Sequence, residues 1–197
     1  MQDVEDLIQR VGQAKAFIDN GLCRVGPKLK PGHKLEALLA GGASRALALS
    51  DAVVRLCRHD HSTEALPLLR QLTEVAVVLR WAAAGDDAEE RAKTALKEMA
   101  AARWDTLWPA ERVSERAAQA GISQQDLGVV LEGSVDFVVG NSTGAPWSHI
   151  FTENQRPAAD PQAVLAAAVR MMGHVLRAMD VKWAGDFPGA EAMWESS

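Results

Sequence analysis

Hydrophobic residues recur at helical spacing, every three to four positions, along most of the chain. The first such stripe predicts a helix over residues 3–19, which should stop at the pair Asn20-Gly21. A second stripe covers residues 35–59, and Gly41-Gly42 should weaken or kink that helix. The alternating pattern of strands, rich in β-branched and aromatic residues, does not appear. The pattern therefore predicts an all-α protein.

Capping residues mark the next two expected helices. Ser62 or Thr63 can cap a helix that ends at Gly85. Asp87, with Glu90 three positions later, forms a capping box for a helix that continues to Pro109. Two separate helices are therefore expected between residues 62 and 109.

The remaining helices begin at similar signals. A short helical segment is expected up to Gln119, and Ser123 with Asp126 begins a fifth helix that ends before Gly140. Asp160 as cap and Pro161 at the first helical position begin the sixth. A chain of 197 residues can bury a hydrophobic core without disulfides or a structural metal. We therefore expect a single-domain bundle of about six helices over residues 1–197.

The last residues of the chain, 182–197, have no helical period but are rich in large apolar side chains. They include Trp183, Phe187, Met193 and Trp194. If they were exposed to solvent, such side chains would form a hydrophobic patch that favours association. We therefore expect this C-terminal tail to pack on the bundle or on a second subunit, and we expect the protein to be a homo-oligomer.

The third expected helix is apolar on almost every side but contains Arg70 and Glu74. A helix that is apolar all round is buried, and buried charge is costly unless it is paired. The spacing of four residues places both side chains on one face, so they can pair. The pair either stabilises the core or forms the floor of a binding site.

The long segment between residues 140 and 158 has no clear period and carries Trp147, Ser148 and His149. Long unstructured loops in compact domains are often functional. If His149 meets Arg70 and Glu74, the three would form a polar pocket for an anionic or polar small molecule, with Trp147 closing over it. The alternative is a buried network that pins the helix to this loop.

The run His59-Asp60-His61, together with Glu64, carries metal-ligand side chains. His61 and Glu64 are three positions apart and share a helical face if both are helical. A metal site needs three or four convergent ligands, and adjacent residues at a helix junction point apart. A metal-dependent helical enzyme that uses His59, His61 and Glu64 therefore stays an alternative, with a solvated turn as the simpler interpretation.

Arg55 and His61 are spaced as in the arginine–histidine motif of HEPN ribonucleases, to which this segment is similar in spacing alone. In such enzymes two subunits bring basic and imidazole groups together on an RNA phosphate. Leu56 stands here where a polar residue often follows the arginine. The resemblance implies a metal-independent ribonuclease as a second alternative.

A broader resemblance covers residues 46–151. The segment LLRQLTEVAVVLRWA contains Arg70 and Glu74, and Ser148-His149 follows in a later loop. These features resemble a family of uncharacterised bacterial helical proteins with a Leu-x-Arg-x-x-x-Glu helix and a later Ser-x-x-x-His segment. The spacing at Ser148 and His149 only approximates the second motif. The family implies no activity that can be transferred.

Composition narrows the function classes further. The net charge of −5 opposes nonspecific attraction to nucleic acid and anionic membranes, and the basic segment Arg24–Lys34 reads as a solvated loop. The two cysteines form no disulfide framework, and no signal peptide or membrane span is apparent. Phosphate loops, dinucleotide fingerprints and zinc spacings are absent, so no cofactor is expected. The sequence predicts a soluble, cytoplasmic binding or interaction protein for an unknown small molecule or protein partner.

Overall fold

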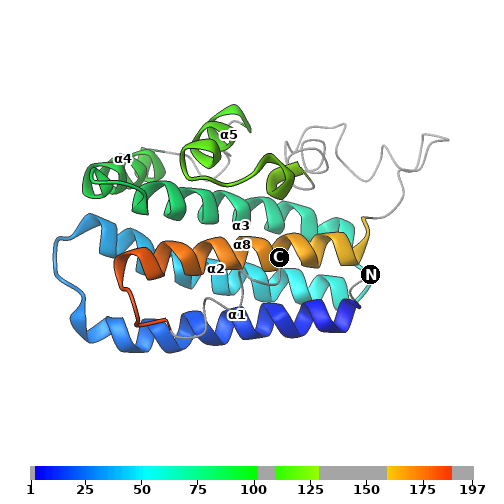
Figure 1. Ribbon diagram of the computed structural model, residues 1–197. Coiled ribbons are helices and arrows are strands. Elements are labelled where there is room, and N and C mark those ends of the chain that lie inside the picture. The colour runs from blue at the N-terminus through cyan, green and yellow to red at the C-terminus, as the bar shows by residue number, and fades with distance from the viewer. Residues whose placement is uncertain (1–2, 102–109, 129–158, 188–197) are drawn as a thin grey trace.

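The computed structural model describes residues 3–101, 110–128 and 159–187, and these residues form an all-α bundle without strands. Four long helices make up its body: α1 (Val4–Val25), α2 (Lys34–Arg58), α3 (Ser62–Ala83) and α8 (Pro161–Lys182). Two shorter helices, α4 (Ala88–Ala101) and α5 (Ala110–Gln119), lie across α3 on the outside of the bundle (Figure 1). The predicted all-α class is confirmed.

Helix α8 lies at the centre of the bundle. It contacts α1, α2 and α3, and its apolar stripe is buried along nearly its whole length. The core that it completes is continuous from α1 to α4. A smaller cluster under α5 joins Val77 of α3 to Val113, Ala117 and the turn that follows α5. Each long helix thus buries one apolar face against its neighbours, as amphipathic helices must.

Helix α1 runs past the expected stop at Asn20-Gly21 and ends at Val25. Gly21 is buried inside the helix, where it does not act as a C-cap. A Cβ atom at Gly21 would lie 2.0 Å from the ring of Phe187, so the glycine makes room for that ring. The helix therefore continues because this glycine serves packing, and the expected end at residue 19 is wrong.

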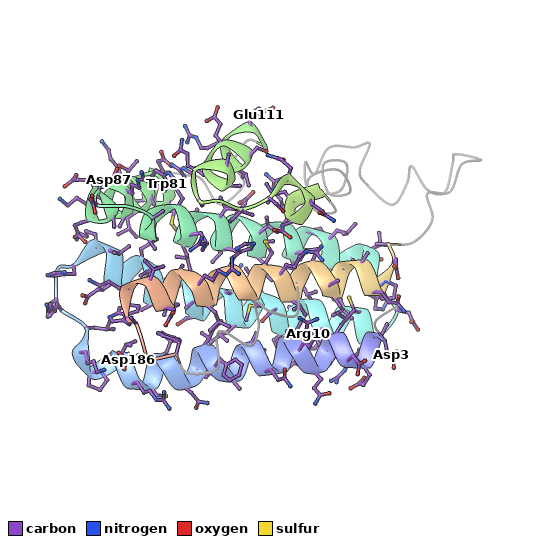
Figure 2. The ribbon with its side chains drawn as sticks, viewed as in Figure 1. Asp3, Arg10, Trp81, Asp87, Glu111 and Asp186 are labelled. Atoms are coloured by element: carbon purple, nitrogen blue, oxygen red, sulfur yellow. The ribbon has the colours of Figure 1, made fainter. Side chains whose placement is uncertain are left out.

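The chain after α8 packs against the bundle as far as residue 187. Trp183 and Phe187 are buried, and their ring centroids lie 6.5 Å apart. Asp186, beside the end of α1 in Figure 2, accepts a 2.7 Å hydrogen bond from Lys28 Nζ. The rest of the expected tail, with Met193 and Trp194, lies outside the described residues, so its packing stays a prediction.

Helix α2 continues without interruption through Gly41-Gly42. A Cβ atom at Gly42 would lie 2.6 Å from the side chain of Leu79, whereas nothing lies within 4 Å of one at Gly41. Gly42 thus permits the close approach of α2 and α3, the helix pair with the most extensive contact. The glycine pair does not interrupt the helix, because packing on α3 supports it there, and the expected weakening or kink stays a prediction.

Within the described residues, α2 is the one helix that is long and apolar enough, by length and composition, to cross a membrane. Helices in the cores of soluble proteins satisfy the same criterion. Helix α2 contacts α1, α3, α4 and α8. Its packing against these four helices accounts for its apolar length.

The start of α2 is held by two carboxylates. Glu89 of α4 accepts hydrogen bonds from the backbone N–H groups of Lys34 and Leu35, at 2.8 and 3.1 Å, and so caps α2 from another helix. Buried Glu36 accepts a 2.7 Å bond from the N–H of Lys30 and lies 3.3 Å from Lys182 Nζ. The basic segment before α2 is therefore tied to the bundle end.

Helices α3 and α8 run parallel (Figure 1), and the first residues of α3 are bonded to the chain just before α8. Ser62 Oγ donates to the carbonyl of Ala159, and the N–H of Ala159 donates to Thr63 Oγ1 at 3.0 Å. The two hydroxyls expected to cap α3 thus link it to α8, and neither one caps α3. Asp160 caps α8 as predicted, accepting from the N–H of Gln162 at 3.0 Å.

Candidate functional site

A groove with a volume of about 220 Å³ lies between α2, α3 and the end of α4. Its walls are mainly apolar and come from all three helices: Leu38, Leu49, Val75, Val78, Leu79 and Met99. Gly42 also lines it, because the absence of a side chain there leaves space beside Leu79. This volume lies below the usual range for drug-sized ligands and suits a smaller molecule.

Glu74, one of the polar residues that line the groove, is paired with Arg70. Arg70 Nε donates to Glu74 Oε1 at 2.8 Å, the contact that the four-residue spacing predicts. The Arg70 side chain is 5% exposed and that of Glu74 is 15% exposed. Burial raises the pKa of the Glu74 carboxyl, and the adjacent Arg70 guanidinium opposes this shift.

The pair is oriented so that Glu74 lines the groove whereas Arg70 is not among its lining residues. Arg45 and Gln71 stand at the groove as well, joined by a 2.9 Å hydrogen bond from Arg45 Nη2 to Gln71 Oε1. A molecule in the groove would therefore meet a carboxylate, an amide, the guanidinium bonded to that amide, and apolar walls. Such a site can accept a hydrogen bond from a ligand that is otherwise apolar.

The other members of the expected pocket, Trp147, Ser148 and His149, lie outside the described residues. Whether they approach Arg70 and Glu74 stays a prediction. The groove was not expected from the sequence, because part of its wall comes from α2 and α4, and no local sequence pattern gives the register of these helices against α3.

The alternative metal ligands lie at the junction of α2 and α3. His59 follows the last residue of α2, His61 precedes α3, and His61 Nδ1 lies 3.8 Å from Glu64 Oε2. No group of three His, Cys, Asp or Glu side chains that could hold a metal ion occurs among the described residues. The part of the chain that the structure describes thus lends no support to a metal centre here.

Arg55 and His61, the pair with HEPN-like spacing, each contact a nearby carboxylate. Arg55 Nε donates to Asp51 Oδ2 at 2.8 Å, one turn earlier on α2, and its side chain is 78% exposed. His61 pairs with Glu64 on the next helix. Within the described residues the two side chains share no partner, and no observation favours the ribonuclease alternative.

A second polar cluster, which the sequence reasoning missed, lies between α3, α8 and the chain after α5. His174 Nε2 lies 3.5 Å from Asp126 Oδ2, and Arg170 Nε lies 3.3 Å from Asp126 Oδ1. Burial lowers the pKa of His174, against the opposing effect of Asp126 and with a further lowering by Arg80. We refer to Arg80, Asp126, Arg170 and His174 as the α3–α8 cluster.

The signal for this cluster was present in the sequence. Arg170, His174 and Arg177 occupy positions i, i+4 and i+7 and so share one face of α8. The methionine-rich stripe of α8 led us to interpret His174 as a core or edge residue. Only the position of Asp126 relative to α8 reveals the cluster, and that position depends on tertiary structure.

Comparison with known proteins gives one match. No curated protein and no solved structure matches the chain. The predicted resemblance to an uncharacterised family is confirmed over part of the chain, and the matching segment includes every residue that lines the α2–α3–α4 groove. Residues 36–125 are similar to a family of unknown function, DUF5677.

Proposed function

We propose that the protein is a soluble helical binding protein that holds a small amphipathic molecule in the α2–α3–α4 groove. The observation that carries this proposal is the placement of Glu74, a partly accessible carboxylate in the wall of a mainly apolar groove whose other polar lining residues, Arg45 and Gln71, are bonded to each other. Buried Arg70 lies behind it and orients it through a 2.8 Å bond. A fixed polar group within apolar walls is the usual composition of a small-molecule site.

The groove favours a ligand with an apolar body and a hydrogen-bond donor, such as an amine. Glu74 is acceptor-only when ionised, and its positive partner Arg70 does not line the groove. An anionic ligand would meet the Glu74 carboxylate before the Arg70 guanidinium, and the Arg45 guanidinium at the groove already donates to Gln71 at 2.9 Å. Of the anionic or polar ligands considered for Arg70 and His149, the proposal keeps neutral polar donors, adds cationic ones and sets anionic ones aside.

The proposal is tested with three probes of matched shape: benzylamine, benzyl alcohol and benzoate. Ligand-observed NMR should show that benzylamine binds the wild-type chain most tightly and benzoate most weakly. Glu74→Gln should remove the preference for the amine while keeping a hydrogen-bond acceptor for Arg70. Equal binding of the three probes, or an unchanged preference in Glu74→Gln, would exclude this site.

A second variant tests the groove without altering the buried pair. Met99 is 50% exposed at the groove, so Met99→Trp should block the space with little effect on the core. Met99→Ala serves as the matched control and should leave binding intact. Glu74→Ala, by contrast, would remove the carboxylate to which buried Arg70 Nε donates and should lower the free energy of unfolding by about 3 kcal/mol. Benzylamine binding that survives Met99→Trp would contradict the assignment of the groove.

The finer features of the proposal are a cytoplasmic location and self-association. The acidic net charge and the unpaired state of Cys23 and Cys57 support a soluble protein of a reducing compartment. Self-association stays a prediction that light scattering on the purified chain can check.

A further inference from the structure

Two opposite charges line the α2–α3–α4 groove at a short separation. Glu74 carries the negative charge, and Arg45 carries the positive one. Arg45 Nη2 donates to Gln71 Oε1 at 2.9 Å, so the guanidinium of Arg45 is tied to α3 at position 71. Gln71 and Glu74 are three positions apart on α3, which places their Cβ atoms roughly 5–6 Å apart on one face. The groove therefore presents a cation and an anion about one helical turn apart.

Both charged groups keep bonding capacity for a ligand. A carboxylate has about four acceptor positions, and the guanidinium of Arg70 can occupy only some of them at Glu74. Arg45 is exposed, and no carboxylate lies within ion-pair distance of it in the described part of the chain. Its bond to Gln71 uses one of several N–H donors. A ligand can thus bond Glu74 through an ammonium group and Arg45 through a carboxylate.

The volume of the groove limits the ligand to a small molecule. An apolar cavity of about 150 Å³ holds benzene, so at the same density the groove volume of about 220 Å³ accommodates about nine non-hydrogen atoms. The apolar wall contributed by α3 is aliphatic and consists of Val75, Val78 and Leu79. The apolar part of a ligand that also carries both charged groups is therefore an aliphatic chain of a few carbons.

We propose that the groove binds a free α-amino acid with a branched aliphatic side chain, of the size of leucine. This inference rests on the proposed function and identifies its amine as the α-ammonium group. The ammonium and the carboxylate of an α-amino acid are bonded to one carbon atom, which suits two charged partners about one helical turn apart. The ammonium binds Glu74, the carboxylate binds the more exposed Arg45, and the side chain packs on the aliphatic wall.

The test measures the binding of four aliphatic probes to the full chain by ligand-observed NMR at about pH 6.5, where the amines are largely protonated. Leucine carries both charges, leucinamide lacks the carboxylate, and 4-methylpentanoate lacks the ammonium. The isomer of leucine 6-aminohexanoate carries both charges at opposite ends. Leucine should bind the wild-type chain about fivefold more tightly than leucinamide, the upper range for an ion pair that solvent reaches. The other two probes should bind more weakly than leucine.

The variant Arg45→Met isolates the carboxylate contact. Position 45 is exposed, so this variant should fold, and in it leucine should lose its advantage over leucinamide. Leucinamide should bind Arg45→Met at least as well as it binds the wild type, which would show that the groove is intact. Arg55→Met, at another exposed arginine of α2 outside the groove, is the matched control and should keep the advantage of leucine.

The outcomes separate this inference from the proposed function. If benzylamine binds the wild type no better than benzoate, the proposed function and this inference both fail. If benzylamine binds as proposed but leucine binds no more tightly than leucinamide, only the amino-acid assignment is wrong. The assignment is also wrong if the advantage of leucine persists in Arg45→Met or disappears in Arg55→Met, or if 6-aminohexanoate binds more tightly than leucine.

Discussion

Two glycines of α1 allow a sharp test of how the chain after α8 packs. A Cβ atom at Gly21 would lie 2.0 and 2.1 Å from two ring carbons of Phe187, far inside van der Waals contact. At Gly12 the same atom would meet nothing within 4 Å. Both residues lie inside α1, so the intrinsic preference of a helix for alanine over glycine is the same at both.

The magnitudes follow from this contrast. Gly12→Ala should raise the free energy of unfolding by about 0.5–1 kcal/mol, the usual gain in helix propensity. Gly21→Ala has the same gain, but it displaces Phe187, which is 2% exposed. Losing the burial of such a side chain costs roughly 1.5–3 kcal/mol, so Gly21→Ala should lower the free energy of unfolding by about 0.5–2.5 kcal/mol in net terms.

Urea unfolding followed by far-UV circular dichroism measures both variants, with the two midpoints compared at a common slope. Gly21→Ala should become stabilising when it is combined with Phe187→Ala, because the second substitution removes the ring that an alanine side chain would displace. If Gly12→Ala and Gly21→Ala stabilise the chain equally, Phe187 does not rest on Gly21 in solution and the reasoning fails.

Two further predictions concern titratable groups. The hydrogen bond from the backbone N–H of Lys30, helped by Lys182, holds the pKa of Glu36 below its ordinary value of 4.5. Ionised Glu36 therefore stabilises the fold fully above pH 4.5, and this stabilisation is lost as the pH falls through its folded-state pKa. In Glu36→Gln, the free energy of unfolding measured by urea titration should fall less steeply as the pH is lowered. Burial raises the pKa of the Cys57 thiol to about 11, whereas Cys23 is exposed. Ellman's reagent should therefore modify one thiol in the native protein and two in urea, and a native Cys23→Ser variant that still reacted at once would contradict the burial of Cys57.

Local patterns in the sequence predict helices well where a signal acts within one turn. Asp160 and Pro161 start α8 as predicted, and the spacing of Arg70 and Glu74 gives the ion pair that forms. These local signals failed where a residue distant in the sequence determines the role of the signal residue. From sequence alone, Gly21 is interpreted as a helix stop and Ser62 as a cap. In the structure, Gly21 makes room for Phe187, and Ser62 donates to the carbonyl of Ala159.

The candidate sites show the same division. Arg70 and Glu74 could be chosen from a single helix, because an ion pair one turn apart in an apolar segment is visible in sequence. The groove above Glu74 and the cluster around His174 could not, since each depends on how α3 lies against α2, α4 or α8. Asp126 and His174 are far apart in the chain, and only the packed bundle joins them.

The central position of α8 affects how the family match should be used in cloning. The matched segment, residues 36–125, includes α2 to α5 but neither α1 nor α8. Helix α8 fills the space between α1, α2 and α3. An expression fragment trimmed to the matched boundaries would therefore expose the apolar inner faces of α2 and α3 to solvent. The matched segment is thus smaller than the bundle that buries the core.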